Sequence, residues 1–248
     1  MIYFILIALF FYTVIQLIET ISFGSRLAGK LSNRLSLGTT LQHSVYVTSR
    51  LFLPPLLLAL SYLIESGLQI RYFLLTSIIL VSIGFLASLL VFIKFNFFQL
   101  LFQHVFILYD KAGSVPIAIL RVIFRRKKIK KIQVINMEST PKITMLSFKK
   151  IMTSALAYFF LSTGFLISFS IAILIPEYRM TVSQLTTVFH GVGAIILAMY
   201  IDPMICNSLD ENINSDKWLE NIYSIFIGRL LAYLLAIGVF LAIYLLLH

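Results

Sequence analysis

Residues 72–93, YFLLTSIILVSIGFLASLLVFI, contain no charged side chain and decide what class of protein this chain belongs to. An α-helix rises about 1.5 Å per residue, so a helix of this length crosses the roughly 30 Å hydrocarbon core of a bilayer. Along the whole chain, 60% of the residues are hydrophobic and only 12% are charged. Soluble domains are typically about a quarter charged. The sequence therefore predicts an integral membrane protein.

Five further apolar runs accompany this one. The first begins at Met1-Ile2 with no basic segment before it and no small-residue cleavage site after it, which favours a retained helix over a signal peptide. We expect an all-α integral membrane protein of about six transmembrane helices, folded as a single polytopic domain over residues 1–248. The predicted spans are residues 2–23, 39–64, 72–93, 151–175, 185–201 and 222–247.

A long loop, residues 94–150, separates the third span from the fourth. Its first part, Phe95–Tyr109, is apolar but is interrupted by four polar side chains and is short for a span. Gly113–Pro116 breaks this piece, and a second apolar piece follows at residues 117–124. Such segments are typical of short interfacial or re-entrant helices, and we expect helices of one of these two kinds in the central loop.

Positive charge is concentrated in the same loop. Twelve of the 20 Lys and Arg residues lie between Lys94 and Lys150, and Arg125–Lys131 is the most basic run. Because basic loops stay in the cytoplasm, alternation of the spans places both termini outside. The net charge of +10 gathers at membrane edges, so we expect the basic run to contact anionic phospholipids and not nucleic acid. The acidic loop expected after the fifth span, from Asp202 to Glu220, then also faces the cytoplasm.

A few ionisable residues fall within or beside the spans, where each costs roughly 2.5–3.5 kcal/mol to insert. Arg50 lies about eleven residues into its span, just before Pro54-Pro55, which is expected to kink or break the helix. We expect Arg50 to face the interior and to pair with Glu19, with backbone carbonyls or with a ligand anion. Glu19 and Arg26 lie seven residues apart and are expected to share a helix face, as a structural pair near the interface. Arg229 is two turns into the sixth span, from which it can reach the inner interface.

No catalytic or metal-binding pattern accompanies these charges. The sequence contains no H-E-x-x-H motif, nucleophile elbow, phosphate-binding loop or pair of catalytic carboxylates. The single cysteine, Cys206, excludes an internal disulfide and a cysteine-rich metal site. We therefore expect no cofactor, no metal and no enzymatic activity. A lone histidine in an apolar helix, such as His190, is more often a hydrogen-bonded core residue than a proton relay.

Several short patterns occur in order along the chain and carry a family resemblance. The patterns are Glu19-Thr20 with Arg26-Leu27-Ala28-Gly29, Thr48-Ser49-Arg50, Gly113-Ser114-Val115-Pro116, and Pro176-Glu177-Tyr178-Arg179 followed by Ser183-Gln184-Leu185 and Asp202-Pro203. Together they resemble the Amj family of bacterial membrane proteins, the alternate lipid II flippases. His190-Gly191 departs from the Asn-Gly expected of the family.

The resemblance implies transport of lipid II, an undecaprenyl-pyrophosphate-linked peptidoglycan precursor, from the inner to the outer leaflet of the bacterial cytoplasmic membrane. The expected cationic path for the pyrophosphate runs from the cytoplasmic side to the outer side. Six helices form a thin wall around so large a headgroup, which favours a homodimer. The expected substrate-binding residues are Arg50, Arg26, Glu19, Arg179 and Arg229, and the candidates for charge or proton coupling are Glu19, Asp202 and His190.

Other functions remain open at this point. A flippase for another polyprenyl-phosphate carrier needs the same cations and the same polar path. A membrane enzyme would need an acid–base or metal constellation, and a scaffold for cell-envelope synthesis would not depend on Arg50. The absence of a nucleotide-binding motif disfavours ATP as the energy source, which leaves a proton gradient, the membrane potential or no coupling at all.

Overall fold

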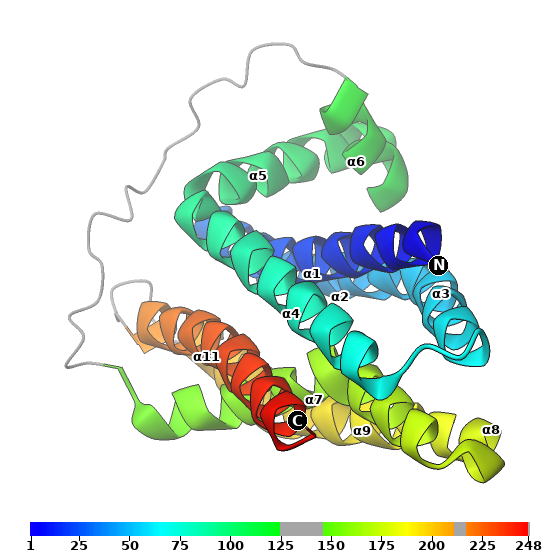
Figure 1. The fold of residues 1–248 in the computed structure, drawn as a ribbon. Coiled ribbons are helices and arrows are strands. Elements are labelled where there is room, and N and C mark those ends of the chain that lie inside the picture. Colours follow the sequence, from blue (N-terminus) through cyan, green and yellow to red (C-terminus); the bar gives the residue numbers. More distant parts are fainter. Residues whose placement is uncertain (125–145, 211–216, 248) are drawn as a thin grey trace.

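The computed structural model describes residues 1–124, 146–210 and 217–247. All regular secondary structure within these ranges is helical (Figure 1). Within these ranges, six helical segments are long and apolar enough to cross a membrane. The all-α membrane fold and the expected number of spans are thus confirmed. The spanning segments are Ile2–Leu31, Leu35–Glu65, Ile70–Ile93, Phe148–Leu174, Pro176–Ser208 and Glu220–Leu246.

The first helix, α1 (Ile2–Leu31), is longer than expected. The prediction that it stops near Gly24 is wrong, because the glycines at its C-terminal end serve close packing and do not end the helix. A Cβ atom at Gly24 would lie 3.3 Å from the Phe102 ring, and one at Gly29 only 2.8 Å from the Cα atom of Gly38. The helix ends where Asn33 takes a left-handed conformation with φ of 53°.

The second span is broken near its middle, as its prolines predict. It consists of α2 (Leu35–Ser49), a 3₁₀ turn η1 (Arg50–Phe52) and α3 (Leu53–Glu65). Pro54-Pro55 falls in the first turn of α3, where a missing N–H leaves no intrahelical bond unmade. The break places Arg50 at the junction of two half-helices. The third span, α4 (Ile70–Ile93), starts two residues before its predicted boundary.

The central loop contains the two short helices that the sequence predicts. These are α5 (Phe95–Ala112) and α6 (Val115–Phe124), which form a hairpin (Figure 1) around Gly113, a residue with φ of +64°. The C-terminal part of α5 is tied to the turn between α1 and α2, because Arg34 donates to both carboxylate oxygens of Asp110 at 2.6 and 2.8 Å. This hydrogen-bonded pair holds the pKa of Asp110 below its usual range. The basic run Arg125–Lys131 lies outside the described residues.

The contacts of α5 favour one of the two expected arrangements. Gly24, in the C-terminal third of α1, faces Gln99 and Phe102 near the start of α5. The Arg34–Asp110 pair joins the far end of α5 to the turn that follows α1. The hairpin therefore lies beside the end of α1 that is predicted to reach the cytoplasm. This position favours an interfacial hairpin over a re-entrant one.

The second half of the chain begins with α7 (Phe148–Leu174). The fifth span follows as a series of short elements and ends in a helix where an acidic loop was predicted. That part of the prediction is wrong: Asp202–Asp210 is helical because Pro203 fits a first turn and Ile205 is buried in the core. Residues 211–216 lie outside the described part, and Glu220 belongs to α11 (Lys217–Leu246). The elements of the fifth span are η3 (Pro176–Tyr178), α8 (Arg179–Ser183), α9 (Leu185–Ile196), the π-helix η4 (Leu197–Ile201) and α10 (Asp202–Asp210).

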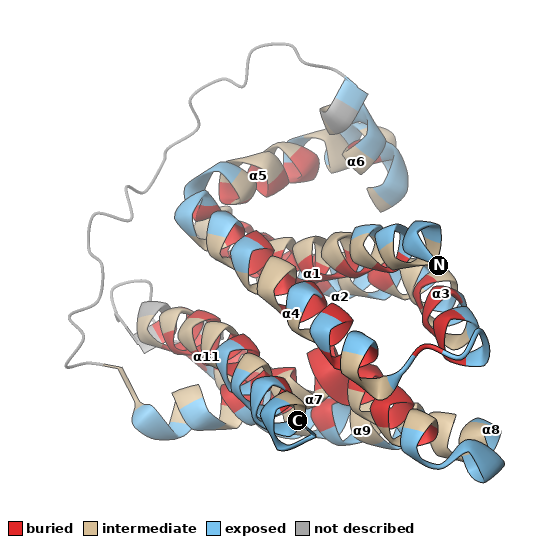
Figure 2. Ribbon diagram, viewed as in Figure 1, coloured by how far each residue is buried: buried red, intermediate tan, exposed pale blue. Residues whose placement is uncertain are grey.

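The core is built around α1, α4, α7 and α11. Figure 2 shows the buried residues on the sides of these helices that face the bundle, while exposed residues lie on its outer surface. One apolar cluster joins Tyr12 of α1 to Leu60, Val81, Phe165 and Tyr233, which come from four other helices. In contrast, α9 packs mainly on α7 and contributes only Gly193 to the buried set. The fifth span is therefore the most peripheral of the six.

We predict that Gly38→Ala destabilises the protein by about 1–3 kcal/mol, the usual effect of overpacking. The added Cβ would lie 2.9 Å from both the Cα atom of Gly29 and the carbonyl oxygen of Ser25. Backbone atoms cannot rotate away as a side chain can, so α1 and α2 must separate. Thermal unfolding of the purified protein in detergent measures the loss.

Gly191→Ala on α9 is the matched control, because nothing lies within 4 Å of a Cβ atom at that position. It should leave the unfolding midpoint unchanged or raise it slightly, since alanine is the better helix former. Equal midpoints for Gly38→Ala and the wild type would contradict the close approach of the two helices.

Candidate functional site

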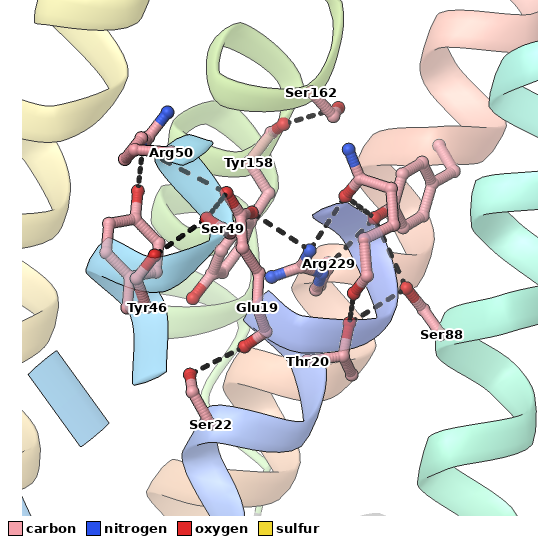
Figure 3. Close-up of polar contacts among 12 residues, drawn as sticks. Glu19, Thr20, Ser22, Tyr46, Ser49, Arg50, Ser88, Tyr158, Ser162 and Arg229 are labelled. Carbon is pink, nitrogen blue, oxygen red and sulfur yellow. Dashed lines mark hydrogen bonds and ion pairs between the residues drawn. The ribbon is translucent and has the colours of Figure 1, made fainter. Parts of the chain in front are cut away.

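The site is centred on Glu19, a buried carboxylate on α1 (Figure 3). Its Oε2 atom accepts a hydrogen bond from Nη2 of Arg229, on α11, at 3.3 Å. Its Oε1 atom accepts one from the hydroxyl of Ser49, on α2, at 3.4 Å and lies 4.0 Å from Nη2 of Arg50. One carboxylate thus faces two arginines from two other spans.

Arg229 is enclosed, with only 2% of its side chain exposed. Besides Glu19 it donates from Nη2 to Oε1 of Gln16 at 2.8 Å and from Nε to the hydroxyl of Tyr233 at 3.2 Å. Its guanidinium carbon lies 4.7 Å from the centre of the Tyr158 ring, within the range of a cation–π contact. A charge at this depth is tolerated because it is paired and surrounded by acceptors and π-faces.

A chain of hydroxyl groups extends the cluster to α4. The hydroxyl of Tyr233 donates to Gln16 at 2.5 Å, and the hydroxyl of Ser88 donates to that of Tyr233 at 3.2 Å. Ser88 also lies 3.1 Å from the hydroxyl of Thr20. Three spans, α1, α4 and α11, are therefore joined through polar groups in the interior of the bundle. Such a network specifies how the helices pack as well as stabilising them.

Arg50 differs from Arg229 in its exposure, because a third of its side chain remains accessible. It donates from Nη2 to the hydroxyl of Tyr46 and lies 4.8 Å over the Tyr46 ring. The ring and the hydroxyl hold the guanidinium at the junction of α2 and η1. The formal charges of Glu19, Arg229 and Arg50 sum to +1, and the exposed member of the three is Arg50.

A second ion pair lies further along α1. Nη2 of Arg26 lies 2.6 Å from Oδ1 of Asp202, the first residue of α10. One turn on, Nζ of Lys30 donates to the carbonyl oxygen of Ser208 at 3.3 Å and lies 5.8 Å from the Trp218 ring. These contacts connect the C-terminal end of α1 to the end of the fifth span.

The remaining candidates lie away from the Glu19 cluster. Arg179 donates to the carbonyl oxygen of Ile64 at 3.3 Å, beside a small cavity of about 60 Å³ near the ends of α3 and α7. The His190 ring stacks on Phe165 with 6.0 Å between ring centres. Neither of its ring nitrogens has a hydrogen-bond partner within the described residues. Within the same residues no group of three or more His, Cys, Asp or Glu side chains gathers as a metal site would require.

Of the three arrangements expected for these charges, the structure contains one. The contact between Arg50 and Glu19 is confirmed. The pairing of Glu19 with Arg26 is wrong: seven residues separate them by roughly 10 Å along the helix, and Arg26 pairs with Asp202. The interpretation that Arg229 reaches the inner interface is also wrong, because it is buried against Glu19.

Four members of the cluster were missed in the sequence. All are uncharged, and single polar or aromatic residues in an apolar helix attract little notice. The available signal is spacing: three of the four lie three or four residues from a charged residue in the same span, and therefore on the same face. These residues are Gln16, which precedes Glu19; Tyr46, which precedes Arg50; Tyr233, which follows Arg229; and Tyr158, for which α7 offers no charged neighbour.

Comparison with known proteins adds one finding. A protein-family model described as "Amj: Alternate to MurJ" matches residues 11–247, nearly the whole chain. The curated proteins and the solved structures contain no match. The family match covers both ion pairs, the first span from residue 11 onward and the other five spans in full.

We predict that Glu19→Gln lowers the free energy of unfolding by about 3–5 kcal/mol, because it leaves Arg229 buried without its counter-charge. The double variant Glu19→Gln/Arg229→Met should be more stable than the Glu19→Gln variant, since it removes both charges and keeps an apolar side chain of similar length. Thermal unfolding of the purified proteins in one detergent provides the comparison.

Asp110→Asn is the matched control for a broken ion pair. Asp110 and Arg34 are about half exposed, so water compensates for the lost contact and the unfolding midpoint should change little. A Glu19→Gln variant that unfolds at the same temperature as Asp110→Asn would show that the buried pair does not stabilise the bundle.

Proposed function

The chain belongs to the Amj family, and from this premise we propose that it moves lipid II from the inner to the outer leaflet of the bacterial cytoplasmic membrane. The family description presents its members as alternates to MurJ, which implies a role as a lipid II flippase. The single observation that supports the proposal most is the surplus charge of the Glu19 cluster. Arg50 is the partly exposed cation of a cluster that holds one acid and two arginines.

A net positive charge within a span calls for an anionic partner. Glu19 lies closer to Arg229, at 3.3 Å, than to Arg50, at 4.0 Å. The carboxylate therefore mainly neutralises the enclosed arginine. The guanidinium of Arg50 keeps its charge at any physiological pH and presents a planar fork that matches phosphate oxygens. We propose that Arg50 binds the pyrophosphate of lipid II and that Glu19 and Tyr46 hold it in position.

A polar face on α2 leads to Arg50. Ser36, Thr40, Ser44 and Thr48 are all exposed and follow one another at intervals of four residues, on one side of the helix. Thr40, Ser44 and Thr48 each donate to the carbonyl oxygen four residues earlier, at 2.9 Å, so their oxygens remain able to accept hydrogen bonds. This hydroxyl stripe runs for roughly 18 Å at helical rise.

The stripe suits the uncharged part of the headgroup. Sugar and peptide groups donate hydrogen bonds, and exposed hydroxyl oxygens in a span provide acceptors that lipid tails lack. The polyprenyl tail can remain in the bilayer, so the path needs no closed pore. We propose that the headgroup enters along the stripe at the N-terminal end of α2 and meets Arg50 at the helix break.

The other candidates take different roles in this proposal. Arg179, beside the small cavity at the far end of α3, is the proposed cation on the outer side. Arg229 supports the site from within and does not contact the substrate. This arrangement assumes that both termini lie outside, as the basic central loop predicts. His190 and Asp202 remain candidates for coupling.

We predict that Arg50→Ala slows lipid II transport by roughly 10- to 100-fold, the loss expected when one charge-assisted hydrogen-bonded contact is removed. Arg50→Lys should retain intermediate activity, because an ammonium keeps the charge but not the fork. Growth of bacteria whose only lipid II flippase is the variant gives the readout, with membrane levels of the protein measured in parallel.

Arg34→Ala is the matched control, since it removes an exposed arginine that is paired with Asp110, outside the cluster. It should support normal growth. Full growth with Arg50→Ala would remove Arg50 from the site. Depletion of the protein should cause lipid II to accumulate in the inner leaflet, whereas accumulation of undecaprenyl phosphate in the outer leaflet would point to the other carrier.

A further inference from the structure

The fifth span is bound tightly to one neighbour and loosely to another. Against α7 the fit is close: a Cβ atom at Gly193 would lie 2.8 Å from the carbonyl oxygen of Ala157, and one at Gly164 would lie 2.6 Å from Cβ of Phe189. Against α1, the contacts of the span include the polar links of Arg26 and Lys30, and Ile201 and Ile205 share an apolar cluster with Phe23 and Leu27. Apolar contacts between membrane helices are readily replaced by lipid tails.

The pair between Arg26 and Asp202 is the strongest of the links to α1. Arg26 is 1% exposed and Asp202 is 20% exposed, and their charged atoms are 2.6 Å apart. Nε and Nη1 of Arg26 are buried and have no hydrogen-bond partner within the described residues. The guanidinium thus uses one of its nitrogens, although its fork can bind two oxygens at once. It is an anion site that its present partner fills only in part.

The backbone next to Asp202 is irregular. The π-helix η4, Leu197–Ile201, ends directly before Asp202, and Pro203 follows it. A π-helix contains looser i→i+5 hydrogen bonds and often marks a functional position, and a proline has no N–H to donate. The segment can therefore bend at this point while α9 stays in place on α7.

We propose that Asp202 is a positioning residue, and that its pair with Arg26 is a latch that holds α10 against α1. When the latch opens, α10 swings about η4 and the anion site at Arg26 becomes accessible. Arg26 cannot lose its charge in the membrane, so another anion must replace Asp202. Given the proposed function, that anion is the pyrophosphate of the polyprenyl lipid.

Cys206 gives a direct readout of the latch. It is the only cysteine of the chain, it is partly buried, and it lies on α10 about one turn after Asp202. We predict that Asp202→Asn raises the rate of maleimide labelling of Cys206 by about tenfold, for purified protein in nanodiscs without substrate. Asp202→Glu should return the rate toward that of the wild type. A wild-type rate in Asp202→Asn would overturn the latch.

Two further variants serve as a control and as an alternative test of the latch. Arg34→Gln breaks the exposed pair at the same end of α1 and should leave the labelling rate unchanged. If Asp202→Asn fails to fold, Arg26→Gln becomes the test: it removes the positive charge that holds Asp202, so its rate should exceed that of the wild type. No increase in Arg26→Gln would equally overturn the latch. Because no lipid substrate is present, these results do not depend on whether the protein transports lipid II.

The displacing anion is tested separately. Nanodiscs that contain undecaprenyl pyrophosphate should speed the labelling of Cys206 in the wild type but not in Asp202→Asn, in which the latch is already open. Nanodiscs with phosphatidylglycerol at the same total charge should not speed it. Equal acceleration by the two lipids, or none by either, would overturn the assignment of pyrophosphate as the group that replaces Asp202.

Discussion

The pairing of Glu19 with Arg229 is the constraint on which the rest of this structure depends. A carboxylate and a guanidinium in the interior of a membrane protein are tolerated only when they meet, because neither lipid nor apolar side chains replace their hydration. Meeting requires that α1 and α11, the first and last helices of the chain, lie at one register, and α4, which packs against both, holds them there. Gln16 and Tyr233 then complete the hydrogen bonds, and Ser88 brings α4 into the same arrangement. The pair therefore joins the N-terminal and C-terminal halves of the chain, and it does so without any substrate.

The two ion pairs along α1 differ in how far their side chains are enclosed. The Glu19–Arg229 pair is enclosed on every side, and loss of either partner leaves a buried charge. The Arg26–Asp202 pair joins α1 to a helix that follows an irregular turn, and its acid is more accessible than its base. Arg50 is held by Tyr46 and Glu19, but a third of its side chain is exposed. α1 thus contributes one partner to a fully enclosed pair, Glu19–Arg229, and one to a pair whose acid is partly exposed, Arg26–Asp202.

The features that could be predicted from the sequence are those that depend on composition over many residues. The spans, the break at Pro54-Pro55 and the helices of the central loop follow from hydropathy, from proline geometry and from a glycine with positive φ. Prediction failed where a property depends on which helices are neighbours. The sequence around Glu19 does not indicate that its partner is Arg229, 210 residues away, because Arg26 lies only seven residues away. Helix ends were misjudged for a related reason, since Gly24 and Gly29 belong to contacts with α5 and α2 that the linear sequence does not reveal.

The hydroxyl stripe on α2 also has a consequence for the bilayer itself. Lipid tails in contact with Ser36, Thr40, Ser44 and Thr48 face oxygen atoms that water and headgroups satisfy better. Water and polar headgroups are drawn inward along such a surface, as they are toward charged residues in a span, and the membrane becomes locally thinner. In the proposed transport of lipid II, the distance that the headgroup travels through hydrocarbon is then shorter beside α2 than elsewhere. The lipid around the protein thus forms part of the proposed path.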